Sequence, residues 1–221
     1  MRLIGKITLF LATFFMCSCV VWAAGFGNKI GITARAGGFL STNGAFDPTY
    51  DLSEMVNIGP YFGGAIRYGI NDNFAVEGSF NWSWNYLKDE KKPRLFFSPH
   101  AFSMPQISLN GVFNFGSLIS PDIKVSPYLT SGVGIYFWKF TGNGVTGRAV
   151  VIPCGRGFEN TSFGINFGAG GEFHLIENIS LSADLRYHFV FTQFGGEDFD
   201  DQGFFGFGAG ATYYFSLSAK Q

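Results

Sequence analysis

The sequence predicts a closed antiparallel transmembrane β-barrel of about eight strands, with short turns at one end and longer loops at the other. Three observations predict this fold. Apolar and polar residues alternate with a period of two in several segments. Beyond the N-terminal region, no apolar run approaches the ~18 residues of a membrane-spanning helix. Charged residues make up only 14% of the chain, against a usual ~25%, so much of the surface is expected to face a solvent other than water.

The N-terminal residues predict a secretory signal peptide. Arg2 and Lys6 precede or border an apolar run at 7–21, and small residues follow at Ala23 and Ala24. We therefore expect a signal peptide over 1–23, cleaved after Ala23 or Ala24, and a barrel domain over 24–221. A permanent helical anchor is the alternative, but the run is shorter than the ~20 residues that cross a bilayer. An exported barrel is expected in a bacterial outer membrane.

The cysteines decide whether a lipoprotein or a disulfide is expected. A lipoprotein is a further alternative, because Cys17 and Cys19 lie within the apolar run, but the residues before Cys19 match a lipid-attachment box poorly. If the signal peptide is removed, only Cys154 remains, and a lone cysteine forms no internal disulfide. We interpret Cys154 as a tolerated loop residue, with a reactive or intermolecular thiol as the alternative.

Two segments carry the clearest strand pattern. In Ile179–Phe191, isoleucine, leucine, tyrosine and phenylalanine share one face, while serine, Asp184, Arg186 and His188 share the other. Phe74–Tyr86 repeats this division, with aromatic residues opposite serine, asparagine and glutamate. Weaker versions of the pattern occur at 29–39, 58–68, 106–115, 128–138, 162–173 and 204–215. Together these segments make about eight strands of membrane-spanning length.

The connections alternate in length, as expected for a barrel with short periplasmic turns and longer extracellular loops. The short links lie at 69–73, 116–123 and 176–178. The long links are rich in charged, Gly, Pro or Asn residues that suit loops, and they lie at 41–55, 87–97, 141–161 and 192–202.

Side-chain size indicates which strand face points outward. A soluble lipocalin-like barrel also alternates, but it keeps its apolar face inside. Here the non-aromatic face is small or polar, as in Gly164, Asn166, Gly168 and Gly170, and an eight-stranded barrel has little room inside. The aromatic face is therefore expected to contact lipid. Two membrane-interface girdles are predicted, one from Tyr68, Phe74, Phe115, Phe173, Tyr213 and Phe215, the other from Trp84, Tyr86, Phe137, Phe189 and Phe191.

A cluster of charged residues is predicted on the lumenal face. Arg67 and Glu77 lie symmetrically about the 71–73 turn, so they are expected to face each other across a hairpin. We interpret the cluster as an ion-pair network that plugs the barrel; a gate or a polar track for a solute is the alternative. Its members are Arg35, Arg67, Glu77, Glu172, Asp184 and Arg186.

The sequence provides little support for catalysis. Asp184 and His188 lie near Ser180 and Ser182, but positions four apart on a strand are separated by about 13 Å at ~3.3 Å per residue, beyond hydrogen-bond reach. We therefore predict no catalytic residue, no cofactor and no metal site. The net charge of −1 argues against nucleic acid as a partner.

Two loops are acidic and one is basic. The first loop carries Asp47, Asp51 and Glu54, and the last carries four further acidic residues at 197–201. We interpret them as a solvated rim, with binding of divalent cations between lipopolysaccharide phosphates as the alternative. The second loop is basic, with Lys88, Lys91, Lys92 and Arg94.

The chain resembles the small outer-membrane barrels of the OmpA, OmpX and OmpW kind, within the porin-like superfamily. The resemblance covers the mature chain and is most evident at 127–136, at 163–173 and at 181–187. Tyr213-Tyr214-Phe215 looks like the terminal aromatic signal read by the barrel assembly machinery, although the family usually ends on that Phe and here 216–221 follow. The resemblance implies a Gram-negative outer membrane and roles as envelope-stabilising proteins, adhesins or narrow conduits.

The leading hypothesis is a non-enzymatic outer-membrane barrel that stabilises the envelope and presents its loops for interaction. The alternatives are a narrow, porin-like conduit for small or hydrophobic solutes, and a lipid-modifying enzyme. The expected partners are outer-membrane lipid and lipopolysaccharide, the barrel assembly machinery during biogenesis, and an extracellular partner that contacts the long loops.

Overall fold

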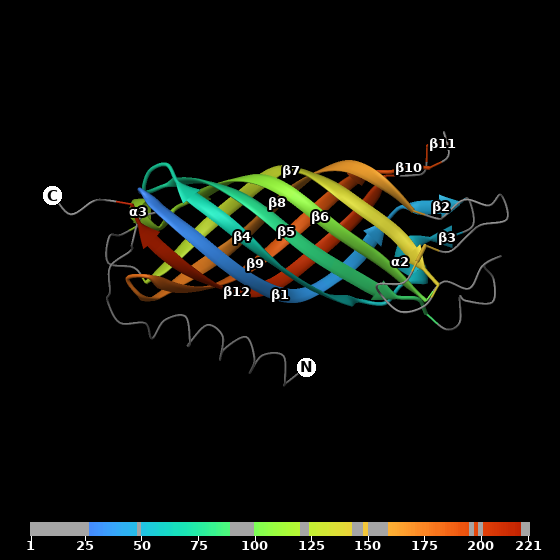
Figure 1. Ribbon diagram of the computed structural model, residues 1–221, viewed down its shortest axis with the longest axis horizontal. Helices are drawn as coiled ribbons and strands as arrows, with labels where there is room; N and C mark the ends of the chain where they lie inside the picture. Colours follow the sequence, from blue (N-terminus) through green and yellow to red (C-terminus); the bar gives the residue numbers. More distant parts are fainter. Residues whose placement is uncertain are drawn as a thin grey trace, which may run out of the picture.

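The described part of the chain forms a closed antiparallel barrel of eight strands, in the order β1-β12-β9-β8-β7-β6-β5-β4 (Figure 1). The computed structural model describes residues 27–47, 50–88, 100–119, 124–142, 148–149, 159–194, 197–198 and 201–217. The pairing of β1 with β12 closes the wall. The barrel strands are β1 Lys29–Asn43, β4 Gly59–Gly69, β5 Phe74–Tyr86, β6 Ala101–Asn114, β7 Val125–Thr141, β8 Glu159–Ile176, β9 Ile179–Phe191 and β12 Gln202–Ser216.

The predicted eight-stranded fold is confirmed, and several strand boundaries need correction. β5 and β9 begin and end where the alternation predicts. β1, β7, β8 and β12 are longer than predicted, and β4 is shifted by one residue. β6 begins at Ala101 rather than at position 106, because all four residues from Ala101 to Met104 are buried. Where both faces of a strand are covered, the polar half of the alternation is lost.

The two ends of the barrel differ, and short elements occupy some of the predicted links. At one end the turns are short, and one of them contains α3, Gly116–Ile119. In the β4–β5 turn, Asn71 Oδ1 accepts hydrogen bonds from the N–H groups of Asn73 and Phe74. At the other end, links predicted as loops contain β2 Ala45–Asp47, β3 Tyr50–Asp51, α2 Leu52–Met55, β10 Gln193–Phe194 and β11 Glu197–Asp198 (Figure 1).

Some predicted features lie outside the described residues. These are the signal peptide over 1–23, Cys154, and the basic residues Lys91, Lys92 and Arg94. Asp51 of the predicted acidic rim is described, and it caps α2 by accepting a hydrogen bond from the N–H of Ser53 at 2.7 Å. Among the described helices, neither is long and apolar enough to cross a bilayer.

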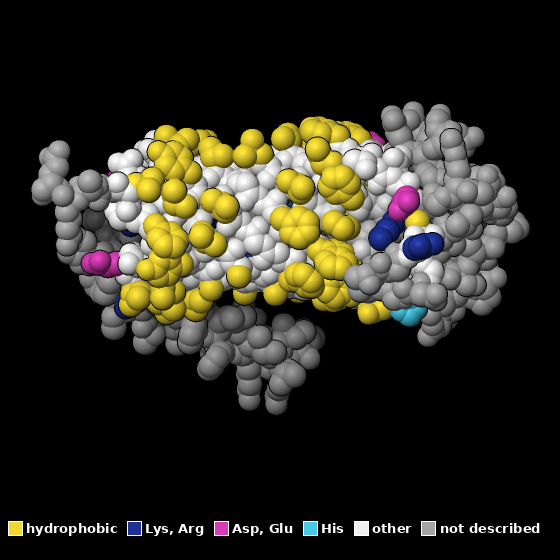
Figure 2. Space-filling view, viewed as in Figure 1, with side chains coloured by type: hydrophobic (Ala, Val, Ile, Leu, Met, Phe, Trp, Pro, Cys, Tyr) yellow, Lys and Arg dark blue, Asp and Glu magenta, His cyan; other side chains and the backbone are white. Residues whose placement is uncertain are grey.

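The outer wall is apolar. Side chains that point away from the lumen include Ile66, Leu109, Ile135 and Phe167, each more than 40% exposed. On the face seen in Figure 2, hydrophobic side chains gather in two bands, one toward each end of the barrel. An exposed apolar surface of this extent is typical of a wall that contacts lipid rather than water.

Closure of the barrel depends on the close approach of β1 and β12. At Gly37, an added Cβ would lie 2.0 Å from the carbonyl oxygen of Phe207 and 2.6 Å from the Cα of Gly208. Both atoms belong to the backbone of β12, so no side-chain rotation relieves the overlap. Gly78 on β5 faces outward, and an added Cβ there meets no atom of the described residues within 4 Å.

We therefore expect Gly37→Val to prevent closure of the barrel and Gly78→Val to permit it. The measurement is heat-modifiability on SDS gels of the membrane fraction. The native chain and Gly78→Val are expected to give a compact, faster band that shifts only on boiling, whereas Gly37→Val is expected to give only the slower band. A compact band from Gly37→Val would contradict this account of the seam.

Candidate functional site

The lumen brings together all six residues of the predicted charged cluster. They come from five strands: Arg35 from β1, Arg67 from β4, Glu77 from β5, Glu172 from β8, and Asp184 and Arg186 from β9. The alternation of side chains along each strand explains this arrangement. Successive residues of a strand point to opposite faces, and each of these six residues occupies an inward position. Three arginines and three carboxylates balance to no net charge.

Glu77 is at the centre of the cluster and is fully buried. Arg67 lies opposite it in the β4–β5 register, and the Arg67 Nη2 to Glu77 Oε2 distance is 2.8 Å. Arg35 Nη2 lies 2.9 Å from Glu77 Oε1, and Arg186 Nη2 lies 3.6 Å from the same oxygen. One carboxylate therefore compensates charge from three arginines, which is how a buried charge becomes tolerable.

Two of these ion pairs cross the lumen. β4 and β8 are four strands apart in either direction around the eight-stranded wall, so they lie on opposite sides. Arg67 Nη1 nevertheless reaches Glu172 Oε2 at 2.9 Å. β5 and β9 are likewise opposite, and they supply the pair between Glu77 and Arg186. Side chains from facing walls thus meet in the middle and fill the cross-section.

Tyr214 completes this layer, and the sequence reasoning did not identify it as a lumenal residue. Its hydroxyl donates a hydrogen bond to Glu172 Oε1 at 2.5 Å. The hydroxyl of Ser180 donates to the same oxygen. Tyr214 lies between two outward aromatic residues of β12, Tyr213 and Phe215. Its position, one residue from each of these outward residues, is the feature of the sequence that could have identified it as an inward residue.

A second, aromatic layer fills the lumen toward the end that carries the long loops. Phe204 on β12 and Phe102 on β6 come from opposite walls, and their rings stack with centroids 5.8 Å apart and an interplanar angle of 11°. The Phe39 ring also stacks on Phe204, with centroids 5.2 Å apart. The buried cluster also contains Leu52, Met55, Val56, Tyr61, Leu87, Met104, Tyr136, Trp138, Phe140 and Val190.

This layer corrects the expectation that the inward face is dominated by small or polar residues. The expectation rested on β8 and β12, whose inward positions carry Gly164, Gly168 and Gly206. Those glycines leave room that large side chains from other strands occupy: a Cβ on Gly164 would lie 2.7 Å from the Tyr136 ring. Small residues on one wall and large ones on another fill a closed lumen together.

The Ser180, Asp184 and His188 side chains have separate partners. The Tyr136 hydroxyl and His188 Nδ1 are 3.0 Å apart, and Ser180 bonds to Glu172. Asp184 lies 3.5 Å from Arg186 and 3.8 Å from Arg35. Among the described lumenal residues, no hydrogen bond joins any two of these three, so they form no relay for proton transfer.

A small polar cavity lies between the charged and aromatic layers. Arg35, Asn81, Gln106, Arg186 and His188 are among the residues that line it. Three buried atoms in its wall, Asn81 Oδ1, Gln106 Oε1 and Arg186 Nη1, have no hydrogen-bond partner among the described residues. Its volume of about 10 Å³ is on the order of a single water site, which is far from an open channel.

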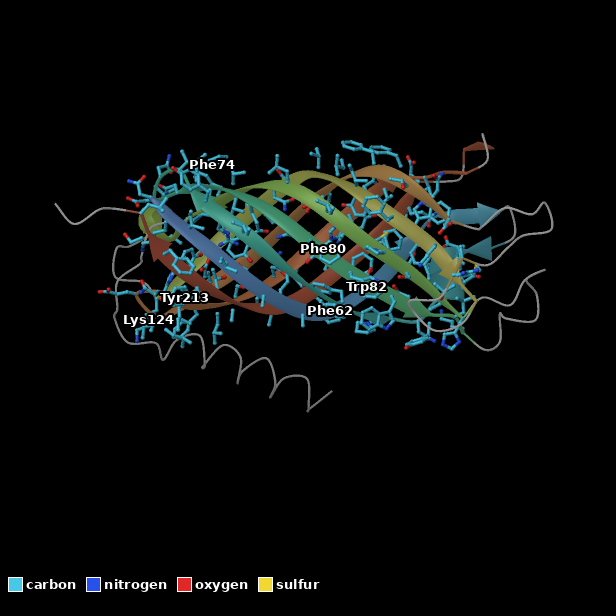
Figure 3. The ribbon with its side chains drawn as sticks, in the orientation of Figure 1. Phe62, Phe74, Phe80, Trp82, Lys124 and Tyr213 are labelled. Carbon is cyan, nitrogen blue, oxygen red and sulfur yellow. The ribbon has the colours of Figure 1, made fainter. Side chains whose placement is uncertain are left out.

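The predicted interface aromatics all occupy outward positions in or directly beside their strands. Tyr68, Phe74, Tyr86, Phe137, Phe191, Tyr213 and Phe215 are exposed, whereas Trp84, Phe115, Phe173 and Phe189 are partly covered. Phe62, Phe80 and Trp82 also point outward, away from the lumen (Figure 3). Phe62, Trp82 and Trp84 form an edge-to-face group with centroids 5.2–5.7 Å apart.

Comparisons with known proteins agree with this architecture. A model of the outer membrane protein beta-barrel domain family matches residues 9–215. No significant match occurs among curated protein sequences.

Three solved structures illustrate the fold. Neisserial surface protein A has a TM-score of 0.56 at 15% identity, over 86% of this chain and 98% of that one. Ail, the attachment invasion locus protein of Yersinia pestis, was solved in complex with a heparin analogue. It has a TM-score of 0.51 at 18% sequence identity, over 85% of this chain and 98% of that one. A major outer membrane protein from Thermus thermophilus has a TM-score of 0.51 at 14% sequence identity, over 85% of this chain and 98% of that one.

Proposed function

The chain belongs to the outer membrane protein beta-barrel domain family, and on this premise we propose that it is a plugged, non-enzymatic barrel that stabilises the envelope. Its location is the bacterial outer membrane. The fold supplies a rigid wall, and the long links at one end supply surfaces for interaction.

The observation that carries the proposal is the pair of contacts across the lumen. Arg67 and Glu172 join β4 to β8 at 2.9 Å, and Phe102 and Phe204 join β6 to β12. The two layers lie at different heights, so a solute would have to displace both. Displacing a buried ion pair exposes charges that have lost their partners, which typically costs ~3–5 kcal/mol.

The rest of the proposal concerns biogenesis and partners. Residues 1–23 serve as the export signal, and Tyr213-Tyr214-Phe215 serves as the signal for the barrel assembly machinery. The outer wall contacts membrane lipid and lipopolysaccharide, and the long loops contact an extracellular partner. The structure of Ail with a heparin analogue supports the idea that a barrel of this shape can engage an external molecule.

The test of the plug is conductance in planar lipid bilayers. We expect the purified native chain to give no steady conductance steps, because the ionic and aromatic layers close the lumen. Steady steps that persist after the long loops are altered would overturn the proposal. The folding of the same reconstituted sample is checked by heat-modifiability. This control excludes the possibility that conductance steps are absent because the sample contains no folded barrel.

A narrow conduit is the second candidate, and the polar cavity between the two layers favours it. Under this hypothesis, the unpartnered atoms of Asn81, Gln106 and Arg186 contact a passing solute. The same bilayer measurement separates the candidates, because a conduit gives steps with the native chain and a plugged barrel does not.

A further inference from the structure

The polar cavity between the charged and aromatic layers spans the lumen from one wall to the opposite wall. Its lining comes from β1, β4, β5, β6, β9 and β12. Asn81 contributes from β5 and Arg186 from β9. These two strands are four apart in either direction around the barrel, so they lie on opposite sides. A molecule in the cavity can therefore contact side chains from both walls at once.

Three polar atoms in the cavity wall have no hydrogen-bond partner among the described residues. Asn81 Oδ1 and Gln106 Oε1 are acceptors, and Arg186 Nη1 is a donor. All three residues are at most 5% exposed. Asn81 and Gln106 occupy paired positions on β5 and β6, so their amides come from neighbouring points of one wall. Buried polar groups of this kind are usually satisfied by the protein or by an ordered solvent molecule.

The chemistry of the wall restricts which ligand the cavity can hold. A cation would lie beside the guanidinium groups of Arg35 and Arg186, and an anion would lie beside the Asp184 carboxylate and two amide oxygens. An apolar ligand would leave all three polar atoms without a hydrogen bond, which is costly in a buried site. The volume of about 10 Å³ is on the order of one water molecule. The ligand is therefore small and neutral, and it both donates and accepts hydrogen bonds.

We propose that one water molecule is held in this cavity, where it donates to Asn81 Oδ1 and Gln106 Oε1 and accepts from Arg186 Nη1. A buried water typically makes about three hydrogen bonds to groups that have no other partner. Arg186 Nη2 lies 3.5 Å from Asp184 and 3.6 Å from Glu77, so the water engages the other terminal nitrogen of the same guanidinium. It links β5 and β6 to β9 between the two layers.

This link is separate from the proposed plug, which depends on the contacts of Arg67 with Glu172 and of Phe102 with Phe204. The water makes no contact that either pair requires. A failure to find it would leave the conductance test of the plug unaffected.

The experiment compares crystal structures of the native chain and of a variant in which the cavity is filled. Gly206 lines the cavity, and an added Cβ there lies 3.4 Å from the Phe39 ring and 3.7 Å from the carbonyl oxygen of Arg186, which are ordinary contacts. Gly206→Ala is therefore expected to fold and to occupy the water position. Gly78→Ala is the matched control, because its methyl group points outward from β5. Heat-modifiability checks that both variants fold.

The native chain and Gly78→Ala are expected to show one density peak at hydrogen-bond distance, ~2.7–3.2 Å, from all three atoms. Gly206→Ala is expected to lose that peak. If Gly206→Ala fails to fold, a nuclear Overhauser effect between water and the Gln106 side-chain amide of the native chain provides an independent test. Absence of the peak or of this effect in the native chain would overturn the proposal. A peak that persists in folded Gly206→Ala, or one with the ~2.0–2.6 Å distances of a coordinated metal ion, would also overturn it.

Discussion

Replacement of Glu77 by Gln is expected to lower the free energy of unfolding by about 3–5 kcal/mol. The substitution keeps the shape of the side chain and removes its charge, leaving three buried arginines with two carboxylates. Glu77 has no exposed surface, and it contacts Arg35 and Arg67 at 2.9 and 2.8 Å. Bulk water therefore does not reach the position of the lost carboxylate. The measurement is urea-induced unfolding from lipid vesicles, followed by the loss of the compact band on gels.

Asp184→Asn is the matched control for Glu77→Gln. It removes the same charge from the same cluster, but the Asp184 carboxylate is 12% exposed and lies 3.5–3.8 Å from its arginines. Its contacts are longer and its carboxylate is partly solvated, so the expected loss is smaller than that of Glu77→Gln. Equal losses for the two variants would mean that total charge, rather than the geometry at Glu77, stabilises the barrel.

Phe204→Ala is the second substitution with a large expected effect, also about 3–5 kcal/mol. Phe204 is 1% exposed and stacks on both Phe39 and Phe102. Its removal leaves a cavity in the aromatic layer and breaks the contact between the opposite strands β6 and β12. The free energy of unfolding in urea is again the measurement, and bilayer conductance is recorded on the same sample.

Phe207→Ala is the control, because Phe207 lies three residues along the same strand but faces outward and is 40% exposed. Lipid can occupy the space that its ring leaves, so we expect a much smaller loss of stability. Because the ionic layer remains intact in Phe204→Ala, that variant is expected to stay non-conducting. Conductance steps from it would show that the aromatic layer alone closes the lumen.

Strand boundaries were predicted well where the alternation of apolar and polar residues was clear. β5 and β9 carry aromatic or aliphatic residues on one face and polar residues on the other along their full length, and their boundaries agree with prediction. β6 was predicted less well, because Ala101–Met104 is buried throughout. In this segment no alternation of apolar and polar residues marks the strand, because both of its faces are buried.

The two lumenal layers could be predicted only in part. Parity places Arg67, Glu77 and Glu172 on the inward face, and the symmetry of the 71–73 turn brings Arg67 opposite Glu77. The inward or outward direction of a residue does not say that Glu172 meets Arg67, which is 105 residues away, and Tyr214, which is 42 residues away. It also does not reveal that Phe102 and Phe204 share one height in the lumen.

The sequence by itself therefore determined the number of strands, the inward or outward direction of most side chains, and the apolar character of the outer wall. These properties depend on residues two apart in the same strand, and they are local. Only the tertiary structure decided which charges pair across the lumen, which rings stack, and which buried polar atoms line one cavity. Those contacts depend on closure between β1 and β12 and on the stagger of the strands, which no single segment of the chain specifies.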